Sequence, residues 1–356
     1  MTSEVVVPVP SAHRRSRFVL LTIVLSLALL ATIVLSLTLG QYALSPTEVV
    51  GVLLRAVGIE TGWAPVGPAD GVVLDIRLPR IVLGLLVGAA LAVSGVLMQA
   101  IFGNPLADAA VVGVSSGAAL GAAASLTFGL ATFGMWTTPG FAFVGGLIAV
   151  FAVYIMSRSG GRTEVVTLLL TGIAINAIAG AGLALLTFLG TTATREEIVF
   201  WQLGSLNGAL WQNIALVAPL VALGVVVALV VAHRLDLIAL GERTARHLGV
   251  RVEGLRIVVI ITVALLVCAA VAFAGIIGFV GLVVPHLMRI MIGPAHLPLV
   301  VTSTLGGALL IAIADVIART AVPMADLPIG MLTSLVGGPF FLWLLVRTRR
   351  RAGGWA

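Results

Sequence analysis

The uncharged stretch IVLGLLVGAALAVSGVLMQAI, which runs from Ile81 to Ile101, decides the fold class of this chain. It can form a transmembrane helix, because about 20 residues at about 1.5 Å rise each cross a hydrocarbon core about 30 Å thick. Arg77-Leu-Pro-Arg80 precedes it and Asn104-Pro-Leu-Ala107 follows it. Small residues recur within it every four positions, at Gly84, Gly88 and Ala92. Because small residues let transmembrane helices approach closely, we predict that this helix packs inside a bundle.

The composition extends this prediction to the whole chain. Hydrophobic residues make up 60% of the 356 residues and charged residues 10%, with a mean hydropathy of +1.20. These values exclude a water-soluble domain. All 20 basic residues are arginine, so the chain has no lysine for a phosphate-binding P-loop, and we expect neither an ATPase site nor enzyme activity. The single cysteine, Cys268, lies in an apolar run and is expected to be a small buried hydrophobe.

Hydropathy predicts an all-α membrane protein, a polytopic bundle of ten transmembrane helices built from residues 1–356 as a single domain. The predicted spans are 18–40, 79–101, 110–130, 139–157, 165–189, 212–233, 256–274, 276–292, 298–317 and 328–346. The first span is longer than the apolar region of a signal peptide, and several arginines precede it. We therefore interpret it as a membrane anchor.

The arginines predict the orientation of the bundle. With ten crossings, both termini lie on one side, and fifteen of the 20 arginines lie on that side. The other five are Arg55, Arg77, Arg80, Arg195 and Arg319. Because cytoplasmic loops are enriched in basic residues, the tails 1–17 and 347–356 are predicted to be cytoplasmic. Arginines at span ends act as orientation signals, so the high pI does not indicate a nucleic-acid partner.

Two predicted outer segments are long enough to carry structure of their own. Ser45-Pro-Thr-Glu48 is a capping box with proline at the first helical position, and it opens a surface helix that closes at Gly58. The segment from Gly190 to Asn213 contains Trp201 and Trp211, which are interpreted as interfacial anchors.

Polar residues are scarce within the predicted spans. Asp108 and Asp315 are placed close to span ends, so no acidic residue is expected near the bilayer midplane. This disfavours an ion-coupled secondary transporter, which commonly carries such acids. Asn176 is the notable polar residue in the middle of a span, and it either forms an interhelical hydrogen bond or lines a transport pathway.

Three arginines on the predicted outer side form a candidate docking surface for acidic groups of an extracytoplasmic partner: Arg77, Arg80 and Arg319. Arg319 and Asp315 have the i, i+4 spacing of a helical ion pair, which is expected to be exposed and to contribute only about 0.3 to 0.5 kcal/mol.

The predicted cytoplasmic segment from Leu237 to Gly249 is interpreted as a short helix that Gly249 ends. Leu240, Ala245 and Leu248 give it an apolar face, with arginines outside that face. Such a segment either docks into a groove on a cytoplasmic subunit or lies on the membrane surface.

These segments together resemble the iron-chelate and vitamin B12 permease family of ATP-binding-cassette importers, over nearly the full length. The segments that carry the resemblance are Arg77–Arg80, Gly88–Gly95 with Gln99, Asn104–Ala107, Trp201–Ser205, Leu240–Gly249, Gly275–His286 with Arg289, Asp315 with Arg319, Leu327–Gly330 and Gly337–Phe340. Ala109 and Gly338 depart from the family pattern, which usually has proline and alanine there.

The resemblance implies the type II importer fold, with a second permease subunit as homodimer or paralogue heterodimer, two cytoplasmic ATPase subunits and an extracytoplasmic substrate-binding protein. By the same resemblance, Arg77, Arg80 and Arg319 engage the binding protein, Asn104 and Leu106 form the cytoplasmic gate, and Asn176 lies on a pathway-lining helix. The residues that match the ATPase coupling helices are Leu240, Gly241, Glu242, Ala245, Leu248 and Gly249.

The implied function is the transport of an iron complex, a ferric siderophore or haem, across the cytoplasmic membrane, with cobalamin as the alternative cargo. Thr171–Asn176 and Phe200–Leu206 with Trp211 resemble the haem-importing branch. An ion-coupled secondary transporter and a non-transporting membrane receptor or scaffold are the readings from other classes. No cofactor and no resident metal site are expected.

Overall fold

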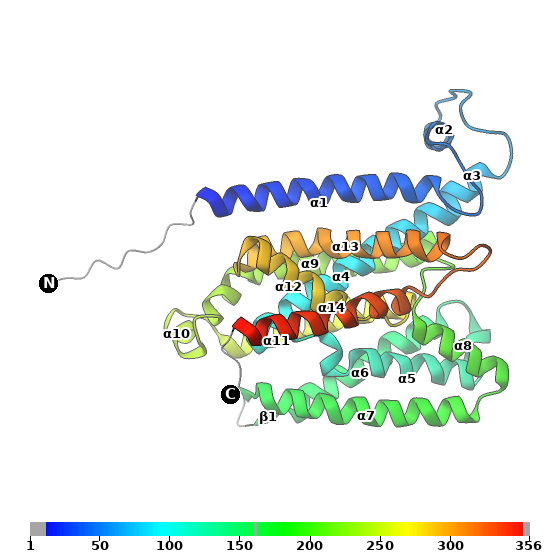
Figure 1. Ribbon diagram of the computed structural model, residues 1–356. Coiled ribbons are helices and arrows are strands. Elements are labelled where there is room, and N and C mark those ends of the chain that lie inside the picture. The colour runs from blue at the N-terminus through cyan, green and yellow to red at the C-terminus, as the bar shows by residue number, and fades with distance from the viewer. Residues whose placement is uncertain (1–11, 160–161, 352–356) are drawn as a thin grey trace.

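The computed structural model describes residues 12–159 and 162–351. The outermost parts of the predicted cytoplasmic tails, residues 1–11 and 352–356, lie outside the described residues. In the described part, long helices lie side by side along one axis (Figure 1). Helix α10 lies at one end of this bundle and helix α2 at the other, so the bundle has two structurally different ends.

Ten of the described helices correspond to the ten predicted spans. They are α1 (Ala12–Thr38), α4 (Leu78–Phe102), α5 (Val114–Thr127), α6 (Thr137–Met156), α7 (Val165–Leu189), α9 (Trp211–Ile238), α11 (Val252–Ala274), α12 (Val280–Ile292), α13 (His296–Thr320) and α14 (Ile329–Arg351). In the described part of the chain, 7 helical segments are long and apolar enough to cross a membrane. The shorter apolar helices are α5, α12 and the Ile329–Trp343 part of α14. The all-helical membrane fold is confirmed.

Shorter elements connect these helices. They are α2 (Pro46–Ala56), α3 (Ala69–Gly71), the π-helix η1 (Val72–Arg77), the 3-10 helices η2 (Ala109–Val112) and η3 (Leu130–Phe133), α8 (Thr192–Leu203), α10 (Glu242–His247), and the antiparallel strands β1 (Arg158–Ser159) and β2 (Arg162–Thr163). The capping box of α2 is confirmed, because the Glu48 N–H donates to the Ser45 hydroxyl oxygen at 3.3 Å and the Ser45 N–H donates to the Glu48 carboxylate. The Ser45 N–H and hydroxyl both donate to that carboxylate. These two hydrogen bonds hold the pKa of the Glu48 carboxyl below its usual value.

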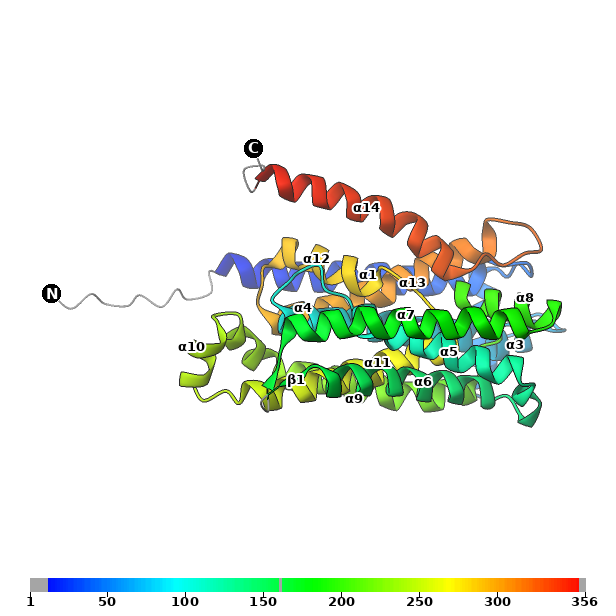
Figure 2. The same ribbon diagram turned by 90° about the horizontal axis from the view of Figure 1, so that it is seen from below.

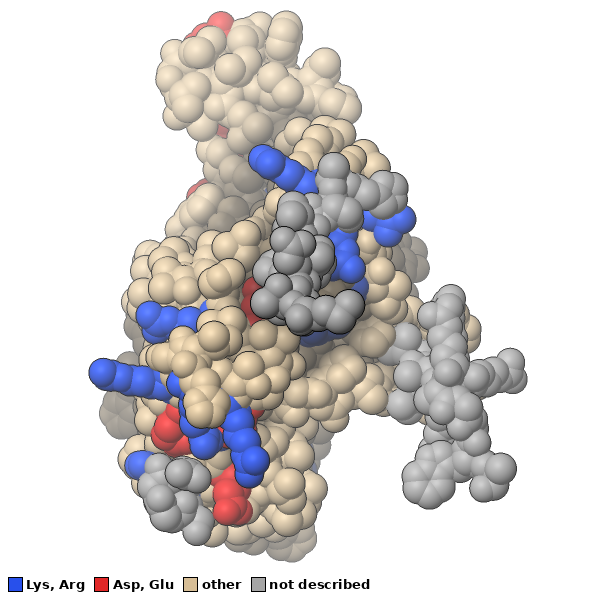
Figure 3. Space-filling view, turned by 90° about the vertical axis from the view of Figure 1, so that its left-hand side faces the viewer, with Lys and Arg blue, Asp and Glu red and all other residues tan. Residues whose placement is uncertain are grey.

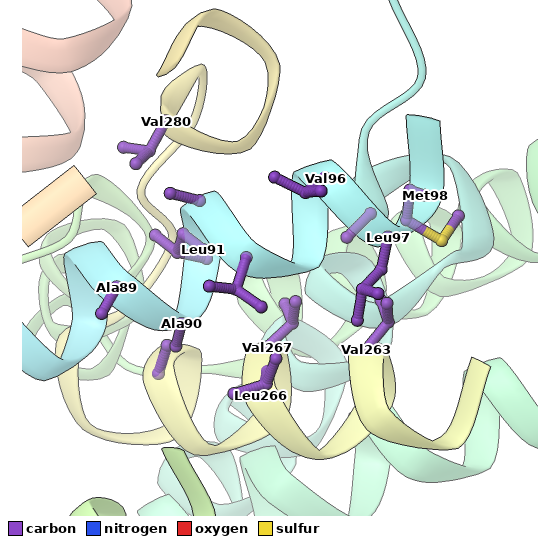
Figure 4. Close-up of a cluster of buried hydrophobic side chains, with 14 of the residues drawn as sticks. Ala89, Ala90, Leu91, Val96, Leu97, Met98, Val263, Leu266, Val267 and Val280 are labelled. Carbon is purple, nitrogen blue, oxygen red and sulfur yellow. The ribbon is translucent and has the colours of Figure 1, made fainter. Parts of the chain in front are cut away.

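Helix α4 is the centre of the bundle. It is the most deeply buried of the segments long enough to span a membrane, and it packs against α13, α11, α9 and α12. Figure 4 shows part of this core, where Leu97 of α4 lies beside Val263 of α11. Both side chains are at most 1% exposed. The helix that decided the fold class in the sequence therefore also organises the packing.

The small residues of α4 allow its backbone to touch neighbouring helices. A Cβ added at Gly88 would overlap the carbonyl oxygen of Gly307 on α13, and one at Gly95 would overlap that of Gly281 on α12. Gly84 faces side chains of α13 and of the loop after α8. The predicted stripe of small residues is thus confirmed as a packing face. Close backbone approach matters here because lipid provides no hydrophobic drive between helices.

The helix that contains α4 begins earlier than the sequence predicted. A continuous helical segment runs from Ala69 to Phe102, whereas the predicted span began at residue 79. Pro79 lies inside this segment, although proline lacks an N–H and its ring collides with the preceding turn of a regular α-helix. The π-helical turn Val72–Arg77 widens the helix just before Pro79, with the Leu78 N–H bonded to the Val73 carbonyl. This turn accommodates the proline inside a longer helix.

Three glycine-containing motifs meet at one corner of the bundle, which we call the glycine corner and define as Gly204, Gly275 and Gly330. A Cβ at any of the three would crowd backbone atoms of the neighbouring segments. The Ser205 N–H donates to the Ala274 carbonyl at 2.8 Å, and the Ile329 N–H donates to the Gly204 carbonyl at 2.9 Å. The corner therefore joins the ends of α8 and α11 to the start of α14.

Substitution of Gly95 tests the central contact of α4. We expect Gly95→Val to lower the thermal stability of the purified protein, because overpacking a tight contact costs about 1–3 kcal/mol. The measurement is the temperature at which half of the detergent-solubilised protein stays monodisperse. Gly180→Val on α7 is the matched control, because a Cβ at Gly180 would have nothing within 4 Å. An equal loss of stability in both variants would contradict the packing role of Gly95.

Candidate functional site

The three arginines proposed from the sequence as a docking surface lie together at the end of the bundle opposite α10. We call this group, with its two carboxylates, the outer arginine cluster: Arg77, Arg80, Arg319, Asp315 and Asp326. Arg80 donates to Asp315 at 2.7 Å and to Asp326 at 2.6 Å. Arg319 donates to the second oxygen of Asp315 at 3.0 Å. Asp315 therefore bridges two arginines.

Most of the cluster is buried, which differs from the sequence-based expectation, and Asp326, with 26% of its side chain exposed, lies at the edge. The side chains of Asp315 and Arg319 are 3% and 9% exposed, so the expectation of an exposed i, i+4 pair was wrong. The second partner of Arg80, Asp326, was also missed. It lies four residues before Gly330 of the Leu327–Gly330 motif, in the loop that leads to the glycine corner. Sequence spacing alone does not show that this loop folds back onto α4.

The remaining hydrogen bonds of the arginines tie down the end of α1. Arg77 donates to the carbonyls of Leu37 and Tyr42, and Arg319 donates to the Ser36 hydroxyl at 2.5 Å. Arg77 also donates to the Thr38 carbonyl, so these three acceptors are all main-chain oxygens. The cluster thus holds three guanidinium groups and two carboxylates, and it keeps an excess positive charge. Whether it docks a binding protein stays a prediction.

The turn after α4 carries the two predicted gate residues. Gly103 ends the helix in the left-handed region, with φ 58°. Asn104 is exposed, and its side-chain oxygen accepts the Leu106 N–H at 2.9 Å, which closes a tight turn around Pro105. The turn is solvent-accessible in this chain. Its role as a gate remains a prediction.

The chain after this turn runs back into the bundle. Asp108 lines an enclosed cavity of about 80 Å³ together with Leu91 and Ser94, which are near the middle of α4. Asp108 therefore lies deeper than the sequence suggested, since it was expected close to a span end. This returning segment explains why α5 has only 14 residues. Part of the membrane depth is already crossed before α5 begins.

Asn176 forms an interhelical hydrogen bond, which was one of the two roles predicted for it. Its side-chain amide donates to the Ala110 carbonyl at 3.2 Å, so α7 is joined to η2 in the returning segment. Gly172, one turn earlier, faces the backbone of Val111 so closely that a Cβ would overlap it. The side-chain oxygen of Asn176 is buried without a hydrogen-bond partner among the described residues. The pathway-lining reading remains a prediction.

The predicted cytoplasmic docking helix is shorter than expected, and its apolar residues do not all face outward. Helix α10 covers only Glu242–His247, and Leu240 and Leu248 flank it. These two leucines are 64% and 56% exposed, whereas Ala245 is fully buried within the subunit. The expectation that the three residues share one exposed apolar face was therefore wrong for Ala245. A six-residue helix offers too few turns for one face to carry all three.

Glycines border α10 on both sides, as the sequence predicted for its end. Gly241 and Gly249 have φ values of 102° and 85°, which favour glycine because it has no Cβ. Glu242 accepts from Arg246 at 2.9 Å and from Arg256 of α11. Figure 3 shows arginine side chains gathered on the end of the molecule that carries α10. The predicted bias of arginines toward one end is visible there.

A bundle of apolar, membrane-length helices defines the class of protein, a polytopic membrane protein. The chain belongs to the FecCD transport family, whose sequence profile matches residues 28–347.

Known proteins similar to the chain include the hemin transport system permease protein HmuU of Yersinia pestis, 43% identical over 79% of this chain and 85% of that protein. The cobalamin import system permease protein BtuC of Halobacterium salinarum is 43% identical over 78% of this chain and 74% of that protein. The Fe(3+)-citrate import system permease protein YfmD of Bacillus subtilis is 37% identical over 78% of this chain and 82% of that protein.

A solved structure also matches. It shows an inward-facing conformation of a metal-chelate type ABC transporter, with a TM-score of 0.80 and 33% identity over 92% of this chain and 98% of that chain. The resemblance to the iron-chelate and vitamin B12 permease family of ABC importers is therefore confirmed. The type II importer fold is confirmed as well.

Removal of the Asp315 charge tests the outer arginine cluster. We expect Asp315→Asn to destabilise the protein by about 3–5 kcal/mol, because breaking a buried ion pair leaves uncompensated charge. The shift in the midpoint of thermal inactivation of the purified protein measures this loss. Asp70→Asn is the matched control, because the Asp70 side chain is 41% exposed and pairs with Arg55 in a more accessible position. That change is expected to cost about 0–1 kcal/mol. Equal shifts would show that the cluster does not stabilise the fold.

Proposed function

We propose that this chain is the permease subunit of an ABC importer that moves an iron complex, either a ferric siderophore or haem, across the cytoplasmic membrane. Family membership over residues 28–347 is the observation that carries this proposal. Cobalamin is the alternative cargo. The chain performs no covalent chemistry in this scheme, since separate subunits bind and hydrolyse ATP.

The similar proteins support an iron complex and keep the alternative open. Two of the three relatives described above are named for hemin and Fe(3+)-citrate, and the third is named for cobalamin. The solved structure belongs to a metal-chelate type transporter. These cargoes are bulky, so a wide path that binds them weakly suits their release better than a tight site. The low charge of the helices agrees with such a path.

The whole chain, residues 1–356, acts in this scheme as a single permease domain with both termini in the cytoplasm. The bundle of interlocked helices and the gathering of arginines on the α10 end support this arrangement (Figure 3). Under the positive-inside rule that end faces the cytoplasm. The outer arginine cluster then faces the extracytoplasmic space, where a substrate-binding protein approaches. The excess positive charge of the cluster suits acidic groups on that protein.

A second permease subunit completes the translocation path in this proposal. Figure 2 shows α14 diverging from the other helices toward its C-terminal end. Leu335 and Val336 on α14, and Ile173 and Phe188 on α7, are exposed apolar side chains. Such faces suit burial against a second copy or a paralogue. Asn176 on α7 and the turn with Asn104 and Leu106 would then lie beside the path and at its cytoplasmic gate.

Two cytoplasmic ATPase subunits would drive the cycle through α10 and its flanking residues. Leu240 and Leu248 project from the α10 end with more than half of their surfaces exposed. Exposed leucines flanked by charged residues suit a groove on a partner protein. Closure of the ATPase pair would move α10 and switch the bundle between two packed states, an alternating-access mechanism.

Reconstitution tests the proposed function. We expect proteoliposomes that contain this chain, its ATPase subunits and its binding protein to take up a ferric siderophore or haem when ATP is present. The measurement is accumulation of radiolabelled iron or of haem absorbance inside the vesicles. Omission of ATP or of the binding protein is the control. Uptake of cobalamin alone would favour the alternative cargo, and uptake driven by an ion gradient without ATP would overturn the proposal.

Charge placed on the exposed leucines tests the ATPase contact. We expect Leu240→Glu with Leu248→Glu to reduce co-purification of the ATPase subunits about tenfold or more, because each buried interface leucine contributes about 1 kcal/mol or more. His247→Gln is the matched control on an exposed neighbouring side chain. Full retention of the ATPase subunits by the leucine variant would show that α10 is not the contact. Ala245→Arg is unsuitable for this test, because Ala245 is buried inside the subunit.

A further inference from the structure

A network of buried and partly buried hydrogen bonds joins α10 to the start of α7, and the proposed function assigns it no role. We call it the Arg256 network and define it as Glu242, Arg256, Thr163 and Glu253. Glu242 opens α10, Arg256 and Glu253 lie in the first turns of α11, and Thr163 ends strand β2 directly before α7. The consecutive helices α10 and α11 therefore meet the β2–α7 junction, which lies about ninety residues earlier in the sequence, through four side chains.

Arg256 occupies the centre of this network. It is 7% exposed, and one of its terminal nitrogens donates to the Thr163 carbonyl at 3.1 Å while the other donates to Glu242. The planar guanidinium can hold two acceptors in fixed directions at once. Arg256 thus connects α10 to the β2–α7 junction directly.

Glu253 fixes the same junction from the other side. Its two carboxylate oxygens accept the Thr163 N–H at 3.1 Å and the Thr163 hydroxyl at 2.5 Å. Thr163 is 3% exposed. Every polar group of Thr163 that faces α11 is therefore bonded to a charged side chain, and such hydrogen bonds are about twice as strong as neutral ones. These bonds hold the chain just before α7 against the start of α11.

The network differs from an ordinary surface ion pair. Glu242 also pairs with Arg246, but that pair joins two residues of the same short helix, and both side chains are 40% exposed or more. A pair of that kind contributes little. The pair between Glu242 and Arg256 joins different helices, and the Arg256 side chain is only 9% exposed.

The surroundings leave room for the network to move. A hollow of about 540 Å³ lies beside it and is lined by Glu164, Val166, Arg246 and the network residues. Leu240 and Leu248, which flank α10, are exposed, so a partner that holds them can pull on α10. Ala245 is buried in the hydrophobic core and keeps α10 packed against the bundle. Displacement of α10 can therefore reach Arg256 through Glu242, while α10 also packs against α9.

We propose that Arg256 is a positioning residue that transmits displacement of α10 to the N-terminal end of α7. This inference rests on the proposed function, in which α10 meets the ATPase subunits and α7 borders the translocation path. Arg256 touches neither ATP nor cargo. It couples α10 to α7 because one of its acceptors, Glu242, belongs to α10 and the other, the Thr163 carbonyl, lies just before α7.

Arg256→Lys is the sharpest test, because lysine keeps the positive charge but lacks the planar fork that reaches both acceptors. We expect the variant complex to keep its ATPase subunits and to hydrolyse ATP within about twofold of the unsubstituted rate. We expect uptake per ATP hydrolysed to fall about tenfold, which corresponds to the loss of one strong hydrogen bond. Arg251→Lys is the matched control, because Arg251 is an exposed arginine beside the same helix.

A distance measurement separates transmission from general weakening. Spin labels at Val166→Cys on α7 and Leu20→Cys on α1, in a Cys268→Ala background, report movement of the start of α7. Val166 and Leu20 are 67% and 62% exposed. In the Arg251→Lys complex, addition of ATP should change this distance. In the Arg256→Lys complex, the ATP-dependent change should be lost.

A second variant keeps the test decisive if Arg256→Lys folds poorly. Glu253→Gln loses one of the two carboxylate acceptors for Thr163, and it should also lower uptake per ATP and reduce the movement of α7. The inference is overturned if both variants match Arg251→Lys in uptake per ATP and in the distance change. It is also overturned if Arg256→Lys loses its ATPase subunits, because Arg256 would then shape the contact itself. Absence of ATP-driven uptake by the unsubstituted complex would instead overturn the proposed function.

Discussion

The backbone contact between α4 and its neighbours is the constraint on which this structure depends. In a bilayer, apolar side chains gain nothing by leaving lipid for protein, so helices associate through close packing and hydrogen bonds. Glycines at positions 88 and 95 let α4 touch α13 and α12 directly. At one end of α4, Arg80 lies against Asp315. At the other end, the helix is followed by the turn that contains Asn104. Both ends of the proposed transport cycle therefore take their positions from one helix.

The helix positions could be predicted from the sequence far better than the side-chain environments. Apolar stretches located all ten helices, because the thickness of a bilayer sets the length of a typical span, although α5 and α12 are shorter, with 14 and 13 residues. The span 165–189 agrees with α7 at both ends. Helix α8 was missed, since its sequence contains polar residues and only Ile198 is buried in it. Apolar length carries no signal for a short helix of that kind.

Burial of charge was the property that sequence reasoning missed most clearly. Arg80 and Arg319 were expected to be exposed, because isolated arginines near span ends usually reach water. The structure pairs them with Asp315 and Asp326, which lie more than two hundred residues from Arg80. Ala245 was expected to contact a partner, yet it is buried in the protein's own core. A small apolar residue fits either environment, so its sequence context does not decide between them. Such choices depend on long-range contacts, which a single sequence does not encode locally.

The glycine corner has a consequence for how the chain is made. A membrane protein is inserted from its N-terminus, so α8 and α11 are in place before α14 is synthesised. Until then the Gly204 carbonyl lacks the N–H of Ile329, and the space above the Leu203 and Ile276 carbonyls is not yet filled by Gly330. An unsatisfied carbonyl at membrane depth is costly. The start of the last helix therefore satisfies a backbone group that the earlier helices leave open, so the corner is complete only when the chain is nearly finished.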